Sequence, residues 1–217
     1  MRMRKKKHGA ERLSACAELL LENIDEPISS GAEIFGDEGE LWLEIGCGKG
    51  GFACGMAKKY PKANLIAMER VHDVMVIAAE RAMATREERE RDNLRFILGN
   101  AETLPELFCE GSLDAIYLNF SDPWPKKGHA KRRLTHSRFL SIYFSLLKKG
   151  GKLLFKTDNR GLFDFSLEEL TSLGYTCDYV IYDLHASEYA SENVMTEYEK
   201  NFSSKGVPIC ALSVTKK

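Results

Sequence analysis

The sequence predicts an α/β fold in which a seven-stranded, mostly parallel sheet carries helices on both faces. Short apolar runs alternate with segments of helical spacing, and a glycine-rich turn directly follows the first of these runs. The last two apolar runs lack a convincing helix between them. We therefore expect them to form an antiparallel hairpin at one edge of the sheet.

The first part of the chain alternates helices and strands. Apolar residues recur at helical spacing over 10–24, so a helix is expected there. The apolar run 41–46 ends in glycines and is typical of a buried strand. Two more strands are expected at 64–69 and 94–98, and the helices between and after the strands at 51–60, 72–91 and 101–108.

The second part continues this alternation and then departs from it. Strands are expected at 113–120 and 152–157, with a helix at 135–147 and a turn at 148–151 between them. Gly174 is expected to end a helix over 162–173. The last two strands are expected at 175–183 and 208–214. The polar segment 185–206 between them is long for a hairpin loop, which favours an irregular, functional insertion.

Length and charge suggest one domain with a basic tail. A chain of 217 residues suits a single domain, expected over 10–217, after a tail at 1–9. The net charge is only −1, but basic residues gather in the tail and again after Trp124, so a nearly neutral protein can carry a positive face. The tail is either a solubilising segment or an arm that binds nucleic acid.

Cysteine usage and hydropathy bear on the cellular setting. The six cysteines form no C-x-x-C pair and no histidine cluster has metal-ligand spacing, so no metal site is predicted and a reducing compartment fits. No apolar stretch is long enough to span a bilayer, and the basic N-terminus lacks the apolar core of a secretory signal. The expected location is the cytoplasm.

The glycine-rich turn after the first strand is the first candidate binding site. Gly46 and Gly48 allow a tight turn and let a ligand approach the backbone, and the helix beginning near Gly51 points its free N–H groups at the same place. The pattern fits a dinucleotide or S-adenosylmethionine. Glu69, at the end of the second strand, could accept hydrogen bonds from ribose hydroxyls of either ligand.

Two residues favour S-adenosylmethionine over a dinucleotide. Glu44 lies just before the glycines, where its charge would repel a pyrophosphate but attract the ammonium group of a methionine moiety. Asn100, after the third strand, can donate to and accept from an adenine edge. The alternatives are a surface acid at a strand end for Glu44 and a helix N-cap for Asn100.

The segment after the fourth strand is the second candidate site. Asp122 is followed by Pro123, Trp124 and Pro125, so its backbone has little freedom. Trp124 either stacks on a base or caps the end of the sheet. A basic run suited to phosphate follows, unless it is only the solvated start of a helix. It consists of Lys126, Lys127, His129, Lys131, Arg132 and Arg133.

Two later segments offer further acids. Asp158, at the end of the fifth strand, could hold a substrate base from the side opposite Asp122, or could cap the following helix. The segment Thr196, Glu197, Tyr198 and Glu199 places acids and an aromatic ring within the polar insertion. Carboxylates there could accept hydrogen bonds from N1 and N2 of guanine, or the segment is a solvated loop.

Together these segments closely resemble the tRNA (guanine-N7-)-methyltransferase family over nearly the whole chain. They are Glu-Ile-Gly-Cys-Gly-Lys-Gly at 44–50, Glu-Arg at 69–70, Gly-Asn-Ala at 99–101, Phe-Ser-Asp-Pro-Trp-Pro-Lys at 120–126, Lys-Arg-Arg-Leu at 131–134, Lys-Thr-Asp at 156–158 and Thr-Glu-Tyr-Glu at 196–199. The resemblance implies a class I, Rossmann-like methyltransferase fold. It also implies methylation of guanine 46 in the tRNA variable loop, with S-adenosyl-L-methionine as donor.

The resemblance also implies roles for individual residues. The family's cofactor contacts fall on Glu44, Glu69, Asn100 and Asp122, and Asp122 holds the position treated as catalytic. Its substrate contacts fall on Lys126, Asp158 and 196–199. Many members have Asp where this chain has Asn100, which should still bind adenine. The expected protein is a monomer or homodimer with no obligatory protein partner.

Three other functions stay open. A NAD-dependent oxidoreductase would use the same glycines and Glu69 but leaves the basic run unexplained. A non-catalytic RNA-binding protein would bind tRNA without incorporating methyl groups. Methylation of a protein or a small molecule would not need the basic run.

Overall fold

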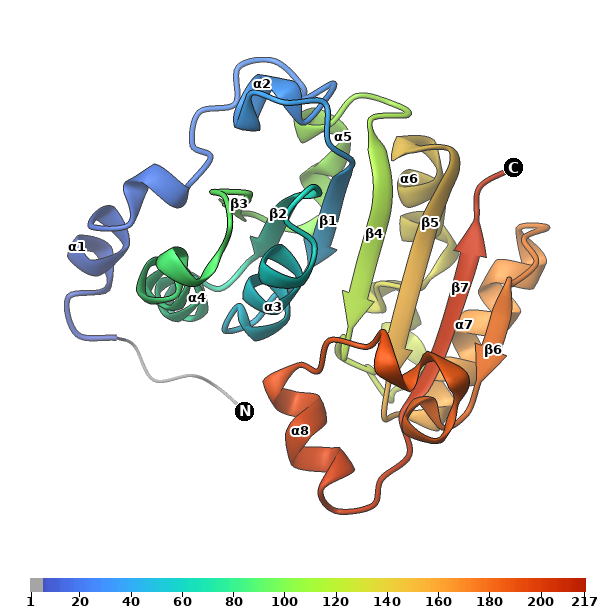
Figure 1. Ribbon diagram of the computed structural model, residues 1–217. Coiled ribbons are helices and arrows are strands. Elements are labelled where there is room, and N and C mark those ends of the chain that lie inside the picture. The colour runs from blue at the N-terminus through green and yellow to red at the C-terminus, as the bar shows by residue number, and fades with distance from the viewer. Residues whose placement is uncertain (1–5) are drawn as a thin grey trace. The chain divides into compact units, whose positions relative to one another are not determined.

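The computed structural model describes residues 6–217, which fall into two units, one ending at Cys109 and the other running from Glu110 to Lys217 (Figure 1). Most of the predicted basic tail, residues 1–5, lies outside the described residues. The prediction of one domain over 10–217 stays a prediction. Each unit builds its own part of the sheet and carries its own group of candidate site residues.

The sheet of the first unit has the order β3-β2-β1 over the residues described there, and both pairings are parallel. Its strands are β1 (Leu41–Ile45), β2 (Asn64–Glu69) and β3 (Leu94–Leu98). Every residue of β2 is buried, which explains the continuous apolar run at 65–68 within it. The parallel arrangement brings the carboxyl ends of the strands to one edge, where Glu44, Glu69 and Asn100 lie at or just beyond the strand ends.

Helices pack around this sheet and against one another. Helices α3 and α4 both contact β2, and α1 packs beside α4 (Figure 1). The helices of the first unit are α1 (Gly9–Ser14), α2 (Ala32–Phe35), α3 (Gly51–Lys59), α4 (His72–Ala84) and α5 (Leu104–Leu107), with 3₁₀ turns at Ala17–Leu19, Arg86–Glu88 and Ala101–Thr103.

Two predicted helices of the first unit are too long. In place of the helix expected over 10–24, the chain forms α1 and a 3₁₀ turn. Helical bonding stops there because the backbone N–H of Leu21 donates to the carbonyl of Phe96 in β3, at 2.8 Å. The apolar spacing beyond Leu19 therefore reflects packing along the edge of a strand. The helix expected over 72–91 ends at Ala84, because a polar network replaces helical bonding after it.

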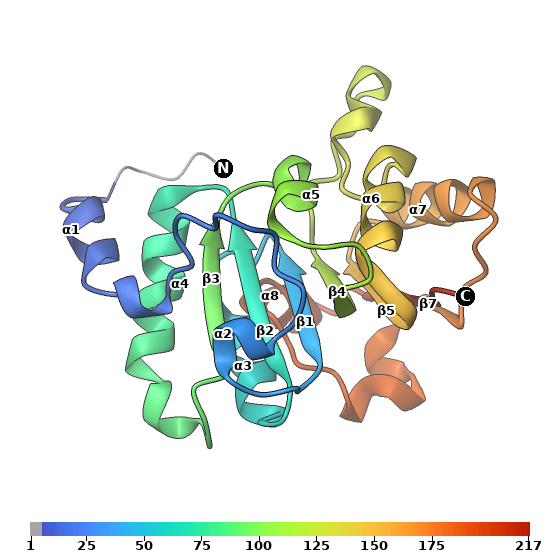
Figure 2. The ribbon, with the colours of Figure 1, turned by 90° about the horizontal axis from the view of Figure 1, so that it is seen from above.

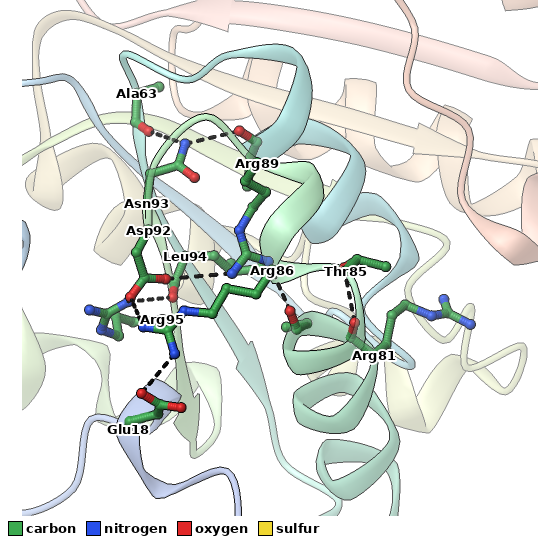
Figure 3. A network of polar contacts seen from close by, with 12 residues as sticks. Glu18, Ala63, Arg81, Thr85, Arg86, Arg89, Asp92, Asn93, Leu94 and Arg95 are labelled. Carbon is green, nitrogen blue, oxygen red and sulfur yellow. Dashed lines mark hydrogen bonds and ion pairs between the residues drawn. The ribbon is translucent and has the colours of Figure 1, made fainter.

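This network fixes the chain between α4 and β3 (Figure 3). The carboxylate of Asp92 pairs with Arg86 at 2.7 Å, Arg95 at 3.1 Å and Arg89 at 3.5 Å. The side chain of Arg89 is 1% exposed, and its guanidinium donates to the carbonyl of Ala82, the last turn of α4. Since these groups lie at the amino end of β3, they stabilise the edge of the sheet opposite the glycine-rich turn.

The sheet of the second unit has the order β4-β5-β7-β6 over its described residues. Strands β4 and β5 pair in parallel, whereas β7 pairs antiparallel with both β5 and β6, so the predicted antiparallel edge hairpin is confirmed. The strands are β4 (Leu113–Asn119), β5 (Leu147–Thr157), β6 (Tyr179–Ile181) and β7 (Cys210–Thr215).

Two long helices pack on this part of the sheet. Helices α6 and α7 lie side by side and both contact β5 (Figure 2). Gly174 follows α7 with φ +79°, which confirms its predicted role in ending the helix. The helices here are α6 (Ser137–Leu146), α7 (Arg160–Ser172) and α8 (Glu197–Ser203), with 3₁₀ turns at Lys127–Arg132, Leu184–Ala186 and Glu188–Ser191.

Three predictions for the second unit are wrong in detail. The turn expected at 148–151 belongs to β5, where Gly150 adopts φ +82° and donates to the carbonyl of Lys216. The strand expected at 175–183 shortens to β6. The insertion at 185–206 is not irregular, because it contains 3₁₀ turns and α8, whose start is fixed by a capping box between Thr196 and Glu199.

The described residues bear on two predicted absences. Over 6–217, none of the helices combines the length and the apolar character that crossing a membrane requires. No group of three or more histidine, cysteine or acidic side chains over the same residues is arranged to hold a metal ion.

Candidate functional site

The turn between β1 and α3, residues 46–51, is termed the glycine loop. Gly46, Gly48 and Gly50 all adopt left-handed backbone conformations, with φ of +78°, +57° and +74°. A Cβ on Gly50 would lie 3.0 Å from the Cβ of Ala78, so this glycine allows α3 and α4 to approach closely. A Cβ on Gly46 or Gly48 would meet no atom within 4 Å, so these two residues present bare backbone to open space.

Glu69 ties the glycine loop to the end of β2. Its carboxylate accepts a hydrogen bond from the N–H of Gly48 at 3.1 Å through one oxygen, and from the N–H of Val71 at 2.9 Å through the other. Glu69 is only 8% exposed. The structure therefore brings together Gly48 and Glu69, two predicted cofactor residues 21 positions apart in the chain.

A second acid makes the surroundings of the loop negative. Glu44 is 1% exposed at the end of β1. Burial raises the pKa of the Cys47 thiol well above its ordinary value, and the charges of Glu44 and Glu69 raise it further. The same two charges would oppose an anionic pyrophosphate and attract a cation. The loop therefore fits a sulfonium and ammonium compound such as S-adenosylmethionine better than a dinucleotide.

Asn100 has the capping geometry that was the alternative to adenine binding. Its side-chain oxygen accepts a hydrogen bond from the N–H of Glu102 at 2.8 Å, at the start of the 3₁₀ turn that follows β3. The residue is nevertheless exposed at the same edge of the sheet as Glu69. The cap orients the amide, and adenine binding by Asn100 stays a prediction.

The turn after β4, residues 120–125, is termed the Asp122 turn. Phe120 and Trp124 adopt left-handed backbone conformations, with φ of +51° and +41°. Such a conformation costs a bulky residue on the order of 1–3 kcal/mol, so surrounding contacts must hold it. One is the hydrogen bond from the N–H of Phe120 to the carbonyl of Lys156 in β5, at 2.9 Å. Asp122 lies exposed between the two strained residues.

Arg133 holds the other end of the Asp122 turn. Its Nε donates to the carbonyl of Pro123 at 3.0 Å, and its Nη2 donates to the carbonyl of Trp124 at 3.1 Å. The guanidinium also lies over the ring of Phe165, 4.3 Å from its centroid. Arg133 is predicted to bind phosphate, but its Nε and Nη2 face backbone carbonyls of the protein.

The remaining basic residues divide by their contacts. Arg132 lies 5.0 Å over the ring of Trp124, and the ring of His129 meets that indole edge-on at 5.8 Å. Lys126, Lys127 and Lys131 are exposed beside them. The rest of the predicted basic run therefore consists of His129 and Arg132, which contact the Trp124 ring, and of exposed lysines beside them.

Asp158 and Tyr198 meet at the carboxyl end of β5. Burial and the Asp158 carboxylate, which accepts a hydrogen bond from the tyrosine hydroxyl, raise the pKa of Tyr198. The ring of Tyr198 lies 5.1 Å from that of Phe120 at the start of the Asp122 turn. The cap of α7 is Asn159, so the alternative prediction of Asp158 as an N-cap is wrong.

Glu199 is fully buried, and both of its carboxylate oxygens have polar partners. It pairs with Lys156 at 2.6 Å, accepts from the amide of Asn193 and the N–H of Thr196, and lies 3.1 Å from His185. Direct substrate contact by Glu199 stays a prediction, because these four contacts are internal to the protein. From the sequence, Lys156 is named only as part of the motif at 156–158, and its ion pair with Glu199 is not predicted. The signal available was a charged residue near the end of an apolar strand, which needs a buried partner.

The predicted site residues therefore form two groups. Glu44, Gly46, Gly48, Glu69 and Asn100 lie at the carboxyl ends of β1, β2 and β3 in the first unit. In the second unit the group at the carboxyl ends of β4 and β5 is Asp122, Lys126, Asp158 and the residues at 196–199. The prediction that Glu44 and Asp122 share one cavity stays a prediction.

Comparison with known proteins decides the family. A family model described as "Putative methyltransferase" matches residues 38–212. A tRNA (guanine-N(7)-)-methyltransferase of Lachnoclostridium phytofermentans is 50% identical over 82% of this chain and 81% of its own length. One of Lactococcus lactis subsp. cremoris is 43% identical over 98% of this chain and 96% of its own length. The chain belongs to the tRNA (guanine-N7-)-methyltransferase family.

Solved structures confirm the fold class of this family member. The structure of an antibiotic-related methyltransferase covers 85% of the chain with a TM-score of 0.61 and 20% identity, and the chain covers 90% of it. A methyltransferase from Pyrococcus furiosus covers 86% of the chain with a TM-score of 0.56 and 20% identity, and the chain covers 79% of it. The predicted class I methyltransferase fold, a mostly parallel seven-stranded sheet over the described residues with antiparallel edge strands, is confirmed.

Proposed function

We propose that this chain transfers the methyl group of S-adenosyl-L-methionine to N7 of guanine 46 in the variable loop of tRNA. Methylation of tRNA guanine at N7 is the activity named for relatives at 50% and 43% identity, and that similarity carries the proposal. Position 46 is the finer part. It rests on the family resemblance of the segments at 120–126 and 196–199.

The residues of the first unit hold the methyl donor. S-adenosyl-L-methionine supplies a methyl group already activated by the positive charge on sulfur. Glu44 and the glycine loop, with Gly46 and Gly48, bind the methionine part, and Asn100 binds adenine. Glu69 accepts from the ribose hydroxyls without giving up its two backbone hydrogen bonds, because a carboxylate has about four acceptor sites.

The residues of the second unit hold guanine. N7 of neutral guanine has a lone pair and no proton, so its attack needs no general base. Positive charge develops on the purine during transfer, and Asp122 stabilises that charge and positions the base, with a contact to the cofactor as well. Asp158, Glu197 and Tyr198 bind the base edge, while Thr196 and Glu199 hold Tyr198 through the capping box and the ion pair.

The basic residues bind the rest of the tRNA. Exposed Lys126, Lys127 and Lys131 contact phosphates, so affinity should fall as salt rises. The RNA-binding surface also includes His129, Arg132 and Arg133, which contact Trp124 beside these lysines. We further propose that the enzyme acts in the cytoplasm, as a monomer or homodimer without an obligatory protein partner.

The test is incubation of the protein with unmodified tRNA and methyl-labelled S-adenosyl-L-methionine, followed by nucleoside analysis. The expected product is 7-methylguanosine, and a matched tRNA with adenosine at position 46 should take up no label. Label in that control would refute position 46. If the protein binds unmodified tRNA but transfers no label to it, the non-catalytic alternative is favoured. If NAD raises the melting temperature of the protein and S-adenosyl-L-methionine does not, an oxidoreductase is favoured.

A further inference from the structure

The guanidinium of Arg133 faces the backbone of the Asp122 turn. We propose that Arg133 is a positioning residue that clamps this turn and so fixes Asp122, and that it is not a phosphate contact. The inference rests on the proposed function, because it assigns Arg133 to the same reaction. It revises the role that the basic run suggests for this one residue.

The geometry of the clamp is specific to arginine. Nε and Nη2 donate to two successive carbonyls, those of Pro123 and Trp124, at 3.0 and 3.1 Å. A planar guanidinium presents two such parallel donors at a fixed spacing, whereas a lysine ammonium is a single point charge. The ring of Phe165 lies against the guanidinium at 4.3 Å and keeps it in its plane.

The turn needs such a clamp because its conformation is strained at both ends. Phe120 has φ +51° and Trp124 has φ +41°, and bulky residues keep left-handed backbone only where their surroundings hold them. β5 holds the first end through the hydrogen bond from Phe120 to Lys156. Arg133 holds the second, so Asp122 lies between two fixed points.

The neighbours of Arg133 are better placed for phosphate. Lys126, Lys127 and Lys131 are exposed, whereas Arg133 is half-buried and spends two of its five N–H donors on the turn. A phosphate contact at Arg133 would compete with these hydrogen bonds. The two roles therefore predict different effects of a charge-conserving substitution.

The deciding experiment compares Arg133→Lys with Lys131→Gln in full-length enzyme. The readouts are kcat, the Kd for unmodified tRNA and the dependence of that Kd on salt. For Arg133→Lys we expect kcat to fall about 100-fold, as for misplacement of a reacting group by about 1 Å, with tRNA affinity and salt dependence as in wild type. For Lys131→Gln we expect weaker tRNA binding and a salt slope smaller by about one.

A second readout follows the turn itself. With Trp42 replaced by phenylalanine, Trp124 is the remaining tryptophan of the chain, and its fluorescence reports on the turn. Arg133→Lys should make Trp124 more accessible to acrylamide quenching while the melting temperature shows a folded protein. If Arg133→Lys does not fold, Phe165→Leu, which removes the ring under the guanidinium, should lower kcat and raise quenching in the same direction.

The outcomes separate the clamp from the proposed function. Wild-type kcat in Arg133→Lys overturns the clamp, and so does unchanged quenching in a folded variant. A third variant, Arg133→Gln, removes the charge that Arg133→Lys keeps. A reduced salt slope in Arg133→Gln with normal quenching would make Arg133 a phosphate contact instead. If wild-type enzyme forms no 7-methylguanosine, the proposed function fails, while the quenching result still tests whether Arg133 orders the turn.

Discussion

The glycine loop and the Asp122 turn both follow a sheet strand and both contain left-handed backbone, but they reach it differently. In the glycine loop the residues with positive φ are Gly46, Gly48 and Gly50, which adopt it without steric cost. In the Asp122 turn they are Phe120 and Trp124, which do not. The first loop is shaped by its own residues, and the second by contacts from elsewhere in its unit.

The difference teaches where each loop is vulnerable. A change within the glycine loop should alter its shape or close the space that its bare backbone leaves open. The Asp122 turn should respond to residues outside it, since β5 and Arg133 hold its two ends. The Asp122 turn carries an acid of its own, whereas the acids beside the glycine loop, Glu44 and Glu69, lie in β1 and β2.

The largest expected effect tests whether the strained turn exists to fix a charge. Asp122→Asn keeps the shape of the side chain, and we expect kcat to fall about 100- to 1000-fold, the cost of removing one preorganised electrostatic group. Asp114→Asn, at the other end of β4, is the matched control and should keep wild-type kcat. Full turnover of Asp122→Asn would refute the charge role.

The next effect concerns stability of the second unit. Glu199→Gln leaves Lys156 buried without its opposite charge, so we expect a loss of about 3 kcal/mol in the free energy of unfolding measured in urea. Glu197→Gln changes the same charge on the same helix at an exposed position, and should stay within about 0.5 kcal/mol of wild type. Equal losses in the two variants would show that the ion pair adds nothing specific.

A smaller effect tests the open space at the glycine loop. Gly48→Ala and Gly111→Ala both introduce a Cβ at positive φ with no atom within 4 Å, so each should cost about 1 kcal/mol of stability. Only Gly48→Ala should weaken S-adenosyl-L-methionine binding, by about tenfold in calorimetric titration, or about 1.4 kcal/mol. An equal Kd in both variants would mean that the cofactor does not approach Gly48.

The smallest effect tests the raised pKa of the Cys47 thiol in the glycine loop. The folded-state pKa of Cys47 is raised, so its contribution to stability is complete below the unfolded value of about 8.5 and is lost as the pH rises toward the folded value. Between about pH 8.5 and the folded-state value, the unfolding free energy should fall less steeply for Cys47→Ala than for wild type, by at most about 1.4 kcal/mol per pH unit. Identical slopes would contradict the raised pKa.

The first unit was the more predictable from sequence. The bounds expected for β2 and β3, 64–69 and 94–98, are those observed, because buried parallel strands are short apolar runs between clear breaks. The glycine spacing predicted the loop for a similarly local reason. The helix at 10–24 failed because the leucines after Leu19 are ordered by β3, a partner that helical spacing cannot reveal.

The chain sequence by itself determined the strand and helix alternation, the glycine loop and the positions of the acids, because these follow from local periodicity and from residue types with fixed backbone preferences. Only the tertiary structure decided what holds those acids. The Lys156–Glu199 pair joins residues 43 positions apart, and the fork of Arg133 reaches carbonyls 10 and 9 residues earlier. Such contacts depend on where the chain returns in space, and a local pattern of residues does not encode that return.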